Sequence, residues 1–315
     1  MKKKISIFTP CYNEEENVEI LYNEVKKVFE QLPQYDYEHV FIDNNSLDKT
    51  VEILKRIANQ DKKVKIIVNA RNFGHIRSPY YGLLQVTGDC VISVVADLQD
   101  PPELIPEFLK KWEEGYKIVT AVKKKSRENP LMFLLRKIYY NILAKFSEGE
   151  QIKNFTGFGL YDKSFIDVIR KIDDPYPYFR GLISEVGFRT ISVEYTQPKR
   201  LHGKTKNNFY TLYDVGMLGF VNHSKLPLRL ASFIGFTVAL ISLFVAIAYF
   251  VYKLVYWDDF KVGTAPLIIG LFFFSSIQLF FIGIIGEYIG AIHTQVRKRP
   301  LVIEKERINF DETLT

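Results

Sequence analysis

Cysteine is scarce in this chain of 315 residues: only Cys11 and Cys90 occur, each in or beside a run of apolar residues. Neither cysteine has Cys or His partners at metal-ligand spacing, so the sequence argues against a disulfide framework and a structural zinc site. Two isolated, buried cysteines favour a reducing compartment. The N-terminus begins Met-Lys-Lys-Lys and then lacks an apolar stretch of signal-peptide length, so we expect no export.

The sequence also lacks the two commonest nucleotide-binding fingerprints. Neither G-x-G-x-x-G nor G-x-x-x-x-G-K-[ST] occurs, which argues against a dinucleotide fold and a P-loop. The net charge is only +6, and the basic residues fall in separate clusters. Such clusters suit phosphates or an anionic membrane face, and we expect no nucleic-acid partner.

Charge is absent from two long runs near the C-terminus, residues 230–252 and 262–286. A bilayer core needs about 20 apolar helical residues, so both runs are long enough to cross it. Basic residues flank the outer ends at Lys225, Arg229 and 297–299. Because positive residues stay on the cytoplasmic side, we expect a multi-pass protein of the cell inner (plasma) membrane. Residues 226–291 would form two transmembrane helices, with 1–225 and the tail 292–315 in the cytoplasm.

Residues 1–225 alternate between short apolar runs and amphipathic segments. Strands are expected over 5–10, 40–43, 65–69 and 90–96, and helices over 14–31, 47–59, 78–85 and 103–114. This order predicts an α/β domain whose parallel sheet is covered by helices on both faces. Ser78-Pro79 suggests a capped helix start. Two further amphipathic helices, at about 130–147 and 208–223, suit either a core or a membrane interface.

Polar side chains follow every expected strand. Ligands of parallel sheets bind beyond the carboxyl ends of the strands, so these positions predict a site: Pro10, Tyr12, Asn13 and Glu14; Asp43, Asn44, Asn45, Ser46 and Asp48; Arg71, Asn72, Gly74 and His75; Asp97, Gln99 and Asp100. Asp100 precedes two prolines and suits a helix cap. Asp97 would then be free for a metal.

Five segments carry a resemblance to a known family: "TPCYNEEENV", "FIDNNSLDKT", "ARNFGHIRS", "ADLQDPPELIPEFLKKWEEGY" and "RLHGKTK". Together with the C-terminal hairpin, they resemble family-two glycosyltransferases, in particular the polyprenyl-phosphate glycosyltransferases. The resemblance implies a GT-A (Rossmann-like) fold and transfer of a sugar, with inversion, from a nucleoside diphosphate, UDP being favoured, to polyprenyl (undecaprenyl) phosphate.

The resemblance also implies roles for individual residues. Pro10, Tyr12, Glu14 and Asp43 would surround the base and ribose, and Asp97 with Gln99 would hold Mg²⁺ or Mn²⁺ at the diphosphate. The catalytic set would be Asp97, Arg200 and Lys206, because the two cations would contact donor or acceptor phosphates. Arg71, Asn72 and Lys204 complete the expected substrate-binding residues.

Three segments depart from the family pattern. Val95 stands where relatives usually carry the first acid of Asp-Ala-Asp, and Phe158 follows Thr156-Gly157 where many carry an acid proposed as the base. Asp43-Asn44-Asn45-Ser46 replaces Asp-Asp-Gly-Ser. The missing base is chemically tolerable, because a phosphate monoester has a second pKa near 6 and is already an anionic nucleophile at neutral pH.

Two other functions stay open at this point. A processive polysaccharide synthase is one, although its Gln-x-x-Arg-Trp motif is absent. A catalytically inactive scaffold that binds nucleotide sugars is the other, because the first acid is missing. Further partners implied by the resemblance are the lipid bilayer, a second copy of this chain in a homo-oligomer such as a tetramer, and a flippase in cell-envelope glycosylation.

Overall fold

A computed structural model describes residues 2–124, 152, 155–198, 200, 226–256 and 264–310. The chain forms two compact units, Met1–Val215 with Arg297–Thr315, and Gly216–Val296. The amphipathic helices expected at 130–147 and 208–223 lie outside the described residues.

The first unit contains a sheet whose N-terminal strands are parallel, as the sequence predicts. They are β1 (Lys4–Cys11), β2 (Asp36–Asp43), β3 (Val64–Asn69) and β4 (Cys90–Ser93). Their order in the sheet is β4-β1-β2-β3, with every neighbouring pair parallel. All four carboxyl ends therefore meet at one edge of the sheet. The helices that connect them are α1 (Val18–Glu30), α2 (Thr50–Gln60) and α3 (Gly74–Leu84).

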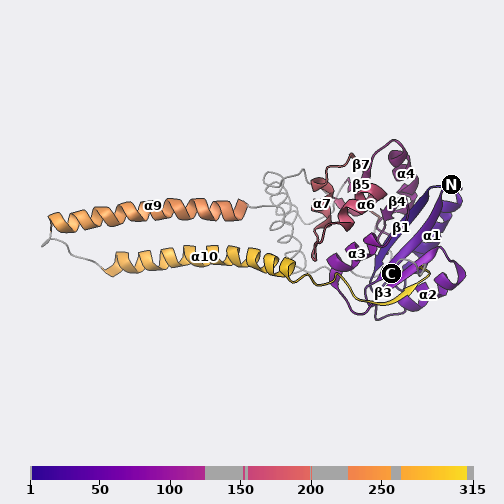
Figure 1. Cartoon of the computed structure of the whole chain (residues 1–315), viewed down its shortest axis with the longest axis horizontal. Helices are drawn as coiled ribbons and strands as arrows, with labels where there is room; N and C mark the ends of the chain where they lie inside the picture. Colours follow the sequence, from indigo (N-terminus) through magenta and orange to yellow (C-terminus); the bar gives the residue numbers. More distant parts are fainter. Residues whose placement is uncertain are drawn as a thin grey trace. The chain divides into compact units, whose positions relative to one another are not determined.

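The remaining strands make the sheet mixed, a feature that the sequence did not reveal. They are β5 (Ile118–Lys123), β6 (Phe155–Asp162), β7 (Thr190–Tyr195) and β8 (Glu304–Ile308). β6 inserts antiparallel between β4 and β5, and β8 pairs antiparallel with β3. In Figure 1 the yellow β8 lies alongside β3, so the chain returns after its apolar helices to complete the sheet. The α/β class is confirmed.

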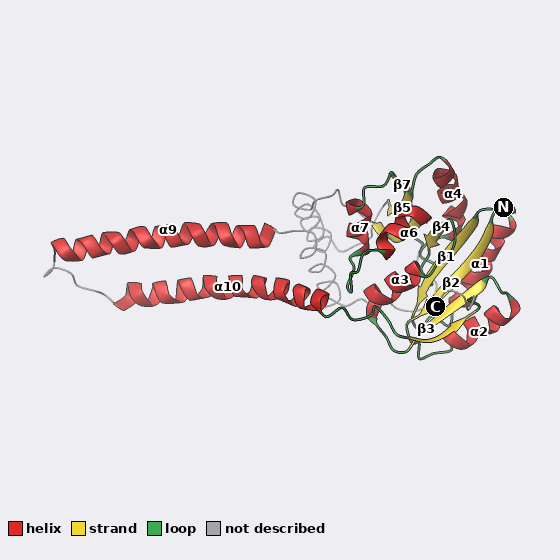
Figure 2. Ribbon diagram, in the orientation of Figure 1, coloured by secondary structure: helices red, strands yellow, loops and turns green. Residues whose placement is uncertain are grey.

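Helices cover both faces of the sheet (Figure 2). On one face, α1 and α4 (Ile105–Glu113), which follows a 3₁₀ turn at Pro102–Leu104, pack on residues such as Ile7. On the other face, α3, α6 (Lys163–Arg170) and α7 (Phe179–Glu185) pack on residues such as Phe8. β1 is buried on both faces, because Ile5 and Ile7 pack on one side of the sheet and Phe8 on the other. Cys11 and Cys90 are buried free thiols.

The expected helix start at Ser78-Pro79 is wrong. α3 begins at Gly74 and contains Pro79. The hydroxyl of Ser78 accepts a hydrogen bond from Nδ2 of Asn69 at 2.9 Å, which ties the helix to the end of β3. Packing of α3 on the sheet therefore outweighs the backbone hydrogen bond that Pro79 cannot donate.

The second unit consists of α9 (Leu226–Val255) and α10 (Thr264–Val296). Leu228–Tyr252 and Ile269–Val296 have mean hydropathies of 2.5 and 2.1, and each is long enough to cross a membrane. Large apolar side chains along both helices are exposed, including Phe233 at 71% and Leu279 at 69%. Water would penalise so much exposed apolar surface, whereas hydrocarbon would not.

Candidate active site

The loops after β1 and β2 are joined by reciprocal hydrogen bonds. The backbone N–H of Asn13 donates to the hydroxyl of Ser46 at 2.8 Å, and Oδ1 of Asn13 accepts from the N–H of Leu47 at 2.8 Å. Asn13 has a φ of 55°, a left-handed conformation that asparagine adopts more readily than most residues. The N–H of Glu14 also donates to Oγ1 of Thr50 at 2.8 Å. These contacts set the two loops beside each other before any ligand binds.

Asn44 connects the loop after β2 to the loop after β3. Its Nδ2 donates to Oδ1 of Asn72 at 3.0 Å, and its Oδ1 accepts from Nδ2 of Asn69 at 3.1 Å and from the N–H of Phe73 at 2.9 Å. A glycine or aspartate could not both donate and accept in this way. The Asn44 amide therefore links the loop after β2 to the loop after β3.

Asp43 ends β2 with a fully buried carboxylate. Ser46 donates to it from both its backbone N–H, at 2.8 Å, and its hydroxyl. Burial raises the pKa of Asp43 above its usual range, although the Ser46 hydrogen bonds oppose that shift. Asp43 therefore stabilises the conformation of the loop after β2 through its hydrogen bonds with Ser46.

Asp97 follows β4 and is paired with a distant arginine. Asp97 is only 7% exposed, and its Oδ2 accepts hydrogen bonds from Nη2 and Nε of Arg200 at 2.6 and 3.0 Å. The N–H of Gln99 donates to Oδ1 at 3.1 Å, and Leu98 between them has a φ of 59°. The turn and the ion pair together hold one carboxylate at the sheet edge.

Asp100 is not the helix cap that the sequence suggested. The 3₁₀ turn at Pro102 has no side-chain cap. Oδ2 of Asp100 instead accepts from the N–H of Val95 at 3.3 Å, and Oδ1 accepts from the hydroxyl of Tyr195 at 3.3 Å. Burial, reinforced by the charge of Asp97, raises the pKa of Asp100 to about 7.

The structure brings most of the expected site residues to one edge of the sheet. Pro10 lies near the end of β1 and Tyr12 and Glu14 follow that strand, while Arg71 and Asn72 follow β3 and are exposed. Because β1 lies between β2 and β4, the ends carrying Asp43 and Asp97 are two strand spacings apart, about 10 Å. Lys204 and Lys206 lie outside the described residues.

The oxygen atoms at this edge of the sheet suit a hard cation whose coordination shell is completed by the substrate. The described residues hold no group of three or more His, Cys, Asp or Glu that could bind a metal. Mg²⁺ usually takes one or two carboxylates and fills its shell with phosphates and water. Asp97 and the side-chain amide of Gln99 could supply such oxygens. The ion pair with Arg200 shows that the Asp97 carboxylate already faces positive charge.

Sequence reasoning missed Asn69, Ser78 and Tyr195. Asn69 at the end of β3 and Ser78 in α3 are buried polar residues joined by a hydrogen bond, and Tyr195 reaches Asp100 from β7. A polar residue ending an apolar strand, as Asn69 does, was the available signal. Nothing in the sequence pointed to Tyr195, since 95 positions separate it from Asp100.

Comparisons with known proteins match almost the whole chain. Residues 6–169 match the family "Glycosyl transferase family 2", and residues 226–292 match "GtrB C-terminal hairpin". The "Uncharacterized glycosyltransferase YkcC" of Bacillus subtilis is 35% identical, covering 97% of this chain and 94% of that protein. The "Bactoprenol glucosyl transferase" of Shigella phage SfX is 33% identical, covering 96% of this chain and 99% of that protein.

A more distant likeness comes from a solved structure. Glucosyl-3-phosphoglycerate synthase from Mycobacterium tuberculosis, crystallised with Mn²⁺, UDP and phosphoglyceric acid, is 16% identical over 69% of this chain and 75% of that chain, with a TM-score of 0.47. A likeness at this level says nothing of the ligands of the present chain.

Proposed function

The chain belongs to glycosyl transferase family 2, and we propose that it transfers a sugar from a UDP-sugar to a polyprenyl phosphate at the cytoplasmic face of a membrane. It is a glycosyltransferase. The acceptor is inferred from the name of the phage relative, a bactoprenol glucosyl transferase that matches 96% of this chain. Donor, acceptor, metal and membrane topology are parts of the proposal.

The observation that carries it is the pairing of Asp97 with Arg200 at the carboxyl edge of β4. A departing nucleoside diphosphate builds up negative charge, and pre-oriented positive groups stabilise that charge best. Arg200 is held within 3.0 Å of Asp97 through two nitrogens. A guanidinium so placed can form two parallel hydrogen bonds to phosphate oxygens.

Asp97 and Gln99 would hold Mg²⁺ or Mn²⁺. When bound, such a cation would offset charge on the diphosphate as the sugar leaves. Arg200 would then exchange its carboxylate partner for a phosphate, so that no charge is left unpaired. Asp43, Tyr12 and Glu14 would surround the nucleoside. The end of β2, which carries Asp43, is about two strand spacings from the end of β4, which carries Asp97.

The acceptor needs no general base from the protein. A phosphate monoester is largely ionised at neutral pH, so the enzyme must position it and offset its charge rather than deprotonate it. One displacement by this nucleophile inverts the anomeric carbon. The missing acid after Gly157 is consistent with that chemistry.

The membrane placement rests on the two helices and their connections. α9 and α10 are long and apolar, and Arg229 and Arg297 flank their outer ends. β8 returns to the same sheet as β1, so both outer ends of the hairpin lead into one folded body. Two crossings satisfy that connectivity, with basic flanks favouring the cytoplasmic side.

Mass spectrometry of lipid products tests the proposal. The purified full chain would be incubated with undecaprenyl phosphate, Mg²⁺ and a panel of UDP- and GDP-sugars. We expect one hexose-class sugar per lipid, and no product from Asp97→Asn. Asp36→Asn, at the opposite end of the sheet and paired with Lys63 on the surface, is the matched control. Near-normal transfer by Asp97→Asn would disprove the role of Asp97.

A further inference from the structure

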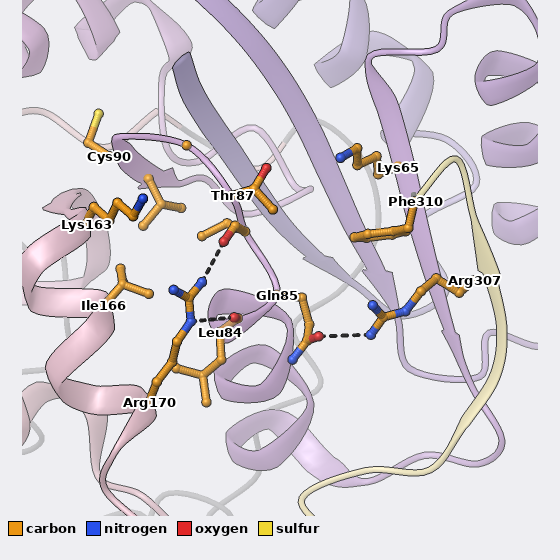
Figure 3. A pocket seen from close by; sticks show the side chains of 13 residues that line it. Lys65, Leu84, Gln85, Thr87, Cys90, Lys163, Ile166, Arg170, Arg307 and Phe310 are labelled. Atoms are coloured by element: carbon orange, nitrogen blue, oxygen red, sulfur yellow. Dashed lines mark hydrogen bonds between the residues drawn. The ribbon is translucent and has the colours of Figure 1, made fainter. Parts of the chain in front are cut away.

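A separate cavity of about 440 Å³ lies near the amino ends of the parallel strands, on the face covered by α3 and α6 (Figure 3). Its walls come from the start of β3, the segment from the end of α3 to the start of β4, helix α6, and β8 with the segment after it. The lining residues are Lys65, Leu84, Gln85, Val86, Thr87, Gly88, Cys90, Val91, Lys163, Ile166, Arg170, Arg307 and Phe310. None of these residues belongs to the proposed catalytic site.

The charge of the lining has one sign. It contains the cations Lys65, Lys163, Arg170 and Arg307, and none of the described lining residues is acidic. Figure 3 shows Lys163 and Arg170 on one side of the cavity, Lys65 and Arg307 on the other, and Thr87 between them. Cations facing a shared cavity repel one another, and an anion between them would relieve that repulsion.

Nearby carboxylates do not fully neutralise these cations. Glu38, which is 2% exposed, is shared by Lys65 at 2.9 Å and Lys4 at 2.7 Å, so one acid offsets two ammonium groups. Arg170 pairs with Asp167, and Arg307 pairs with Glu304. Lys163 forms no ion pair with any residue in the described part of the chain. The cavity therefore keeps a net positive charge.

Hydrogen bonds already hold the two arginines in place. Arg170 donates from Nε to the carbonyl of Leu84 at 2.9 Å and from Nη2 to that of Val86 at 2.6 Å. Nη2 of Arg307 donates to Oε1 of Gln85 at 2.9 Å. The ring of Phe310 lies 4.7 Å from the Arg307 guanidinium and 5.2 Å from the Lys65 ammonium. Because these side chains are already ordered, ligand binding would carry little of the usual entropic cost of immobilising them.

We propose that this cavity binds a small soluble organic phosphate. The cations would bind its phosphate oxygens through charge-assisted hydrogen bonds, and Val91, Ile166 and Phe310 would contact its apolar part. The volume lies in the range of small-molecule sites, roughly 300–1,000 Å³. The bound molecule would join three segments distant in sequence, those around Thr87, Lys163 and Arg307. This inference does not depend on the proposed transfer reaction.

Calorimetric titration of the full-length protein with inorganic pyrophosphate, in EDTA and at low salt, tests the site. We expect saturable binding that Lys163→Gln weakens about tenfold, the size of one charge-assisted hydrogen bond, and that Lys65→Gln also weakens. Lys171→Gln, an exposed lysine just past the same helix, should bind like wild type. Unchanged binding in both Lys163→Gln and Lys65→Gln would overturn the proposal.

Two further measurements locate the ligand. Arg200→Gln should leave pyrophosphate binding intact, and loss of binding in that variant would place the ligand at the catalytic edge instead. Pyrophosphate should also slow amide hydrogen exchange in residues 302–310, and Lys163→Gln should need about ten times more pyrophosphate than wild type for the same effect. Binding of the protein to phosphatidic acid vesicles that depends on Lys163, with no binding of pyrophosphate, would assign the cavity to a lipid headgroup and reject a soluble ligand.

Discussion

Nη2 of Arg200 lies 2.6 Å from Oδ2 of Asp97, although 103 positions separate the two residues in the chain. Their side chains are 25% and 9% exposed, so solvent screens the pair only partly. If one partner of such a pair is removed, the other is left as a largely buried, unpaired charge unless a ligand takes the place of the missing group. We therefore expect the Asp97–Arg200 contact to change when substrate and cation bind.

Substitution of Arg200 should impair chemistry more than stability. We expect Arg200→Gln to lower the rate of sugar transfer about 100-fold, since removal of one pre-oriented charge-stabilising group typically costs about 10²–10³. Arg200→Lys should retain more activity, because it keeps the charge but loses the planar two-nitrogen contact. Single-turnover transfer assays measure both. Arg56→Gln, which breaks a surface pair with Glu19, is the control; similar rates for all three variants would contradict the role of Arg200.

Asp100 should make stability depend on pH. Its folded pKa of about 7 exceeds the ordinary value of 3.8, so between those values the native state holds a proton that the unfolded state has released. Stability from this group is therefore present below about pH 4 and is lost as pH rises to about 7. Asp100→Asn should be more stable than wild type at pH 8, on the order of 2 kcal/mol, and similar to it at pH 4.

Thermal unfolding of wild type and Asp100→Asn in detergent, at several pH values, checks that prediction. Asp167→Asn, an exposed carboxylate on α6, should show no comparable divergence from wild type. If the Asp100→Asn and wild-type melting temperatures differ by the same amount at pH 4 and pH 8, folding does not raise the pKa of Asp100.

Asn309 should stabilise the end of β8. Its Nδ2 donates to the carbonyls of Ala58 and Val64, each at 2.8 Å, and its φ is 60°. Asn309→Ala loses both hydrogen bonds and strains the left-handed backbone, so we expect a loss of about 2–3 kcal/mol in unfolding free energy. Asn309→Gly loses the bonds but tolerates the backbone, and should be less destabilised. Denaturant titration separates the two; a Gly variant less stable than Ala would show that backbone conformation is not a factor.

Membrane topology can be read by thiol labelling, because both native cysteines are buried. An impermeant maleimide applied to intact cells should label Asp258→Cys in the connector, which lies outside the described residues. It should label Lys305→Cys, an exposed position on β8, only after permeabilisation. Labelling of both variants in intact cells would refute a cytoplasmic catalytic unit.

Product size separates a single transfer from polymerisation. A transferase for polyprenyl phosphate should release lipid bearing one sugar however long the reaction runs, whereas a processive synthase should give a ladder. EDTA should abolish either reaction if Asp97 acts through a cation. Tight UDP binding with no turnover under any condition would instead favour the inactive scaffold.

The sequence was sufficient to predict those site residues that directly follow a strand in the chain. Asp43 and Asp97 could be placed because each follows a short apolar run, and parallel strands align their carboxyl ends. The contacts of Asn44 with Asn69, and of Asp100 with Tyr195, could not be predicted, since they depend on strand order and side-chain direction. β8 was missed because Glu-Lys-Glu-Arg-Ile has almost no apolar character; hydrogen bonding to β3, not its own composition, makes it a strand.

β8 also has a consequence for biogenesis. Ile308 pairs with Ile66, yet a ribosome completes both apolar helices before it reaches that strand. Until then the outer edge of β3 has unsatisfied backbone groups, the kind of edge that invites wrong pairing between nascent chains. Pairing of β3 with β8 would thus wait until both apolar helices have been made, and a copy in which only one of them crossed a membrane would carry β8 on the opposite side from the rest of its sheet.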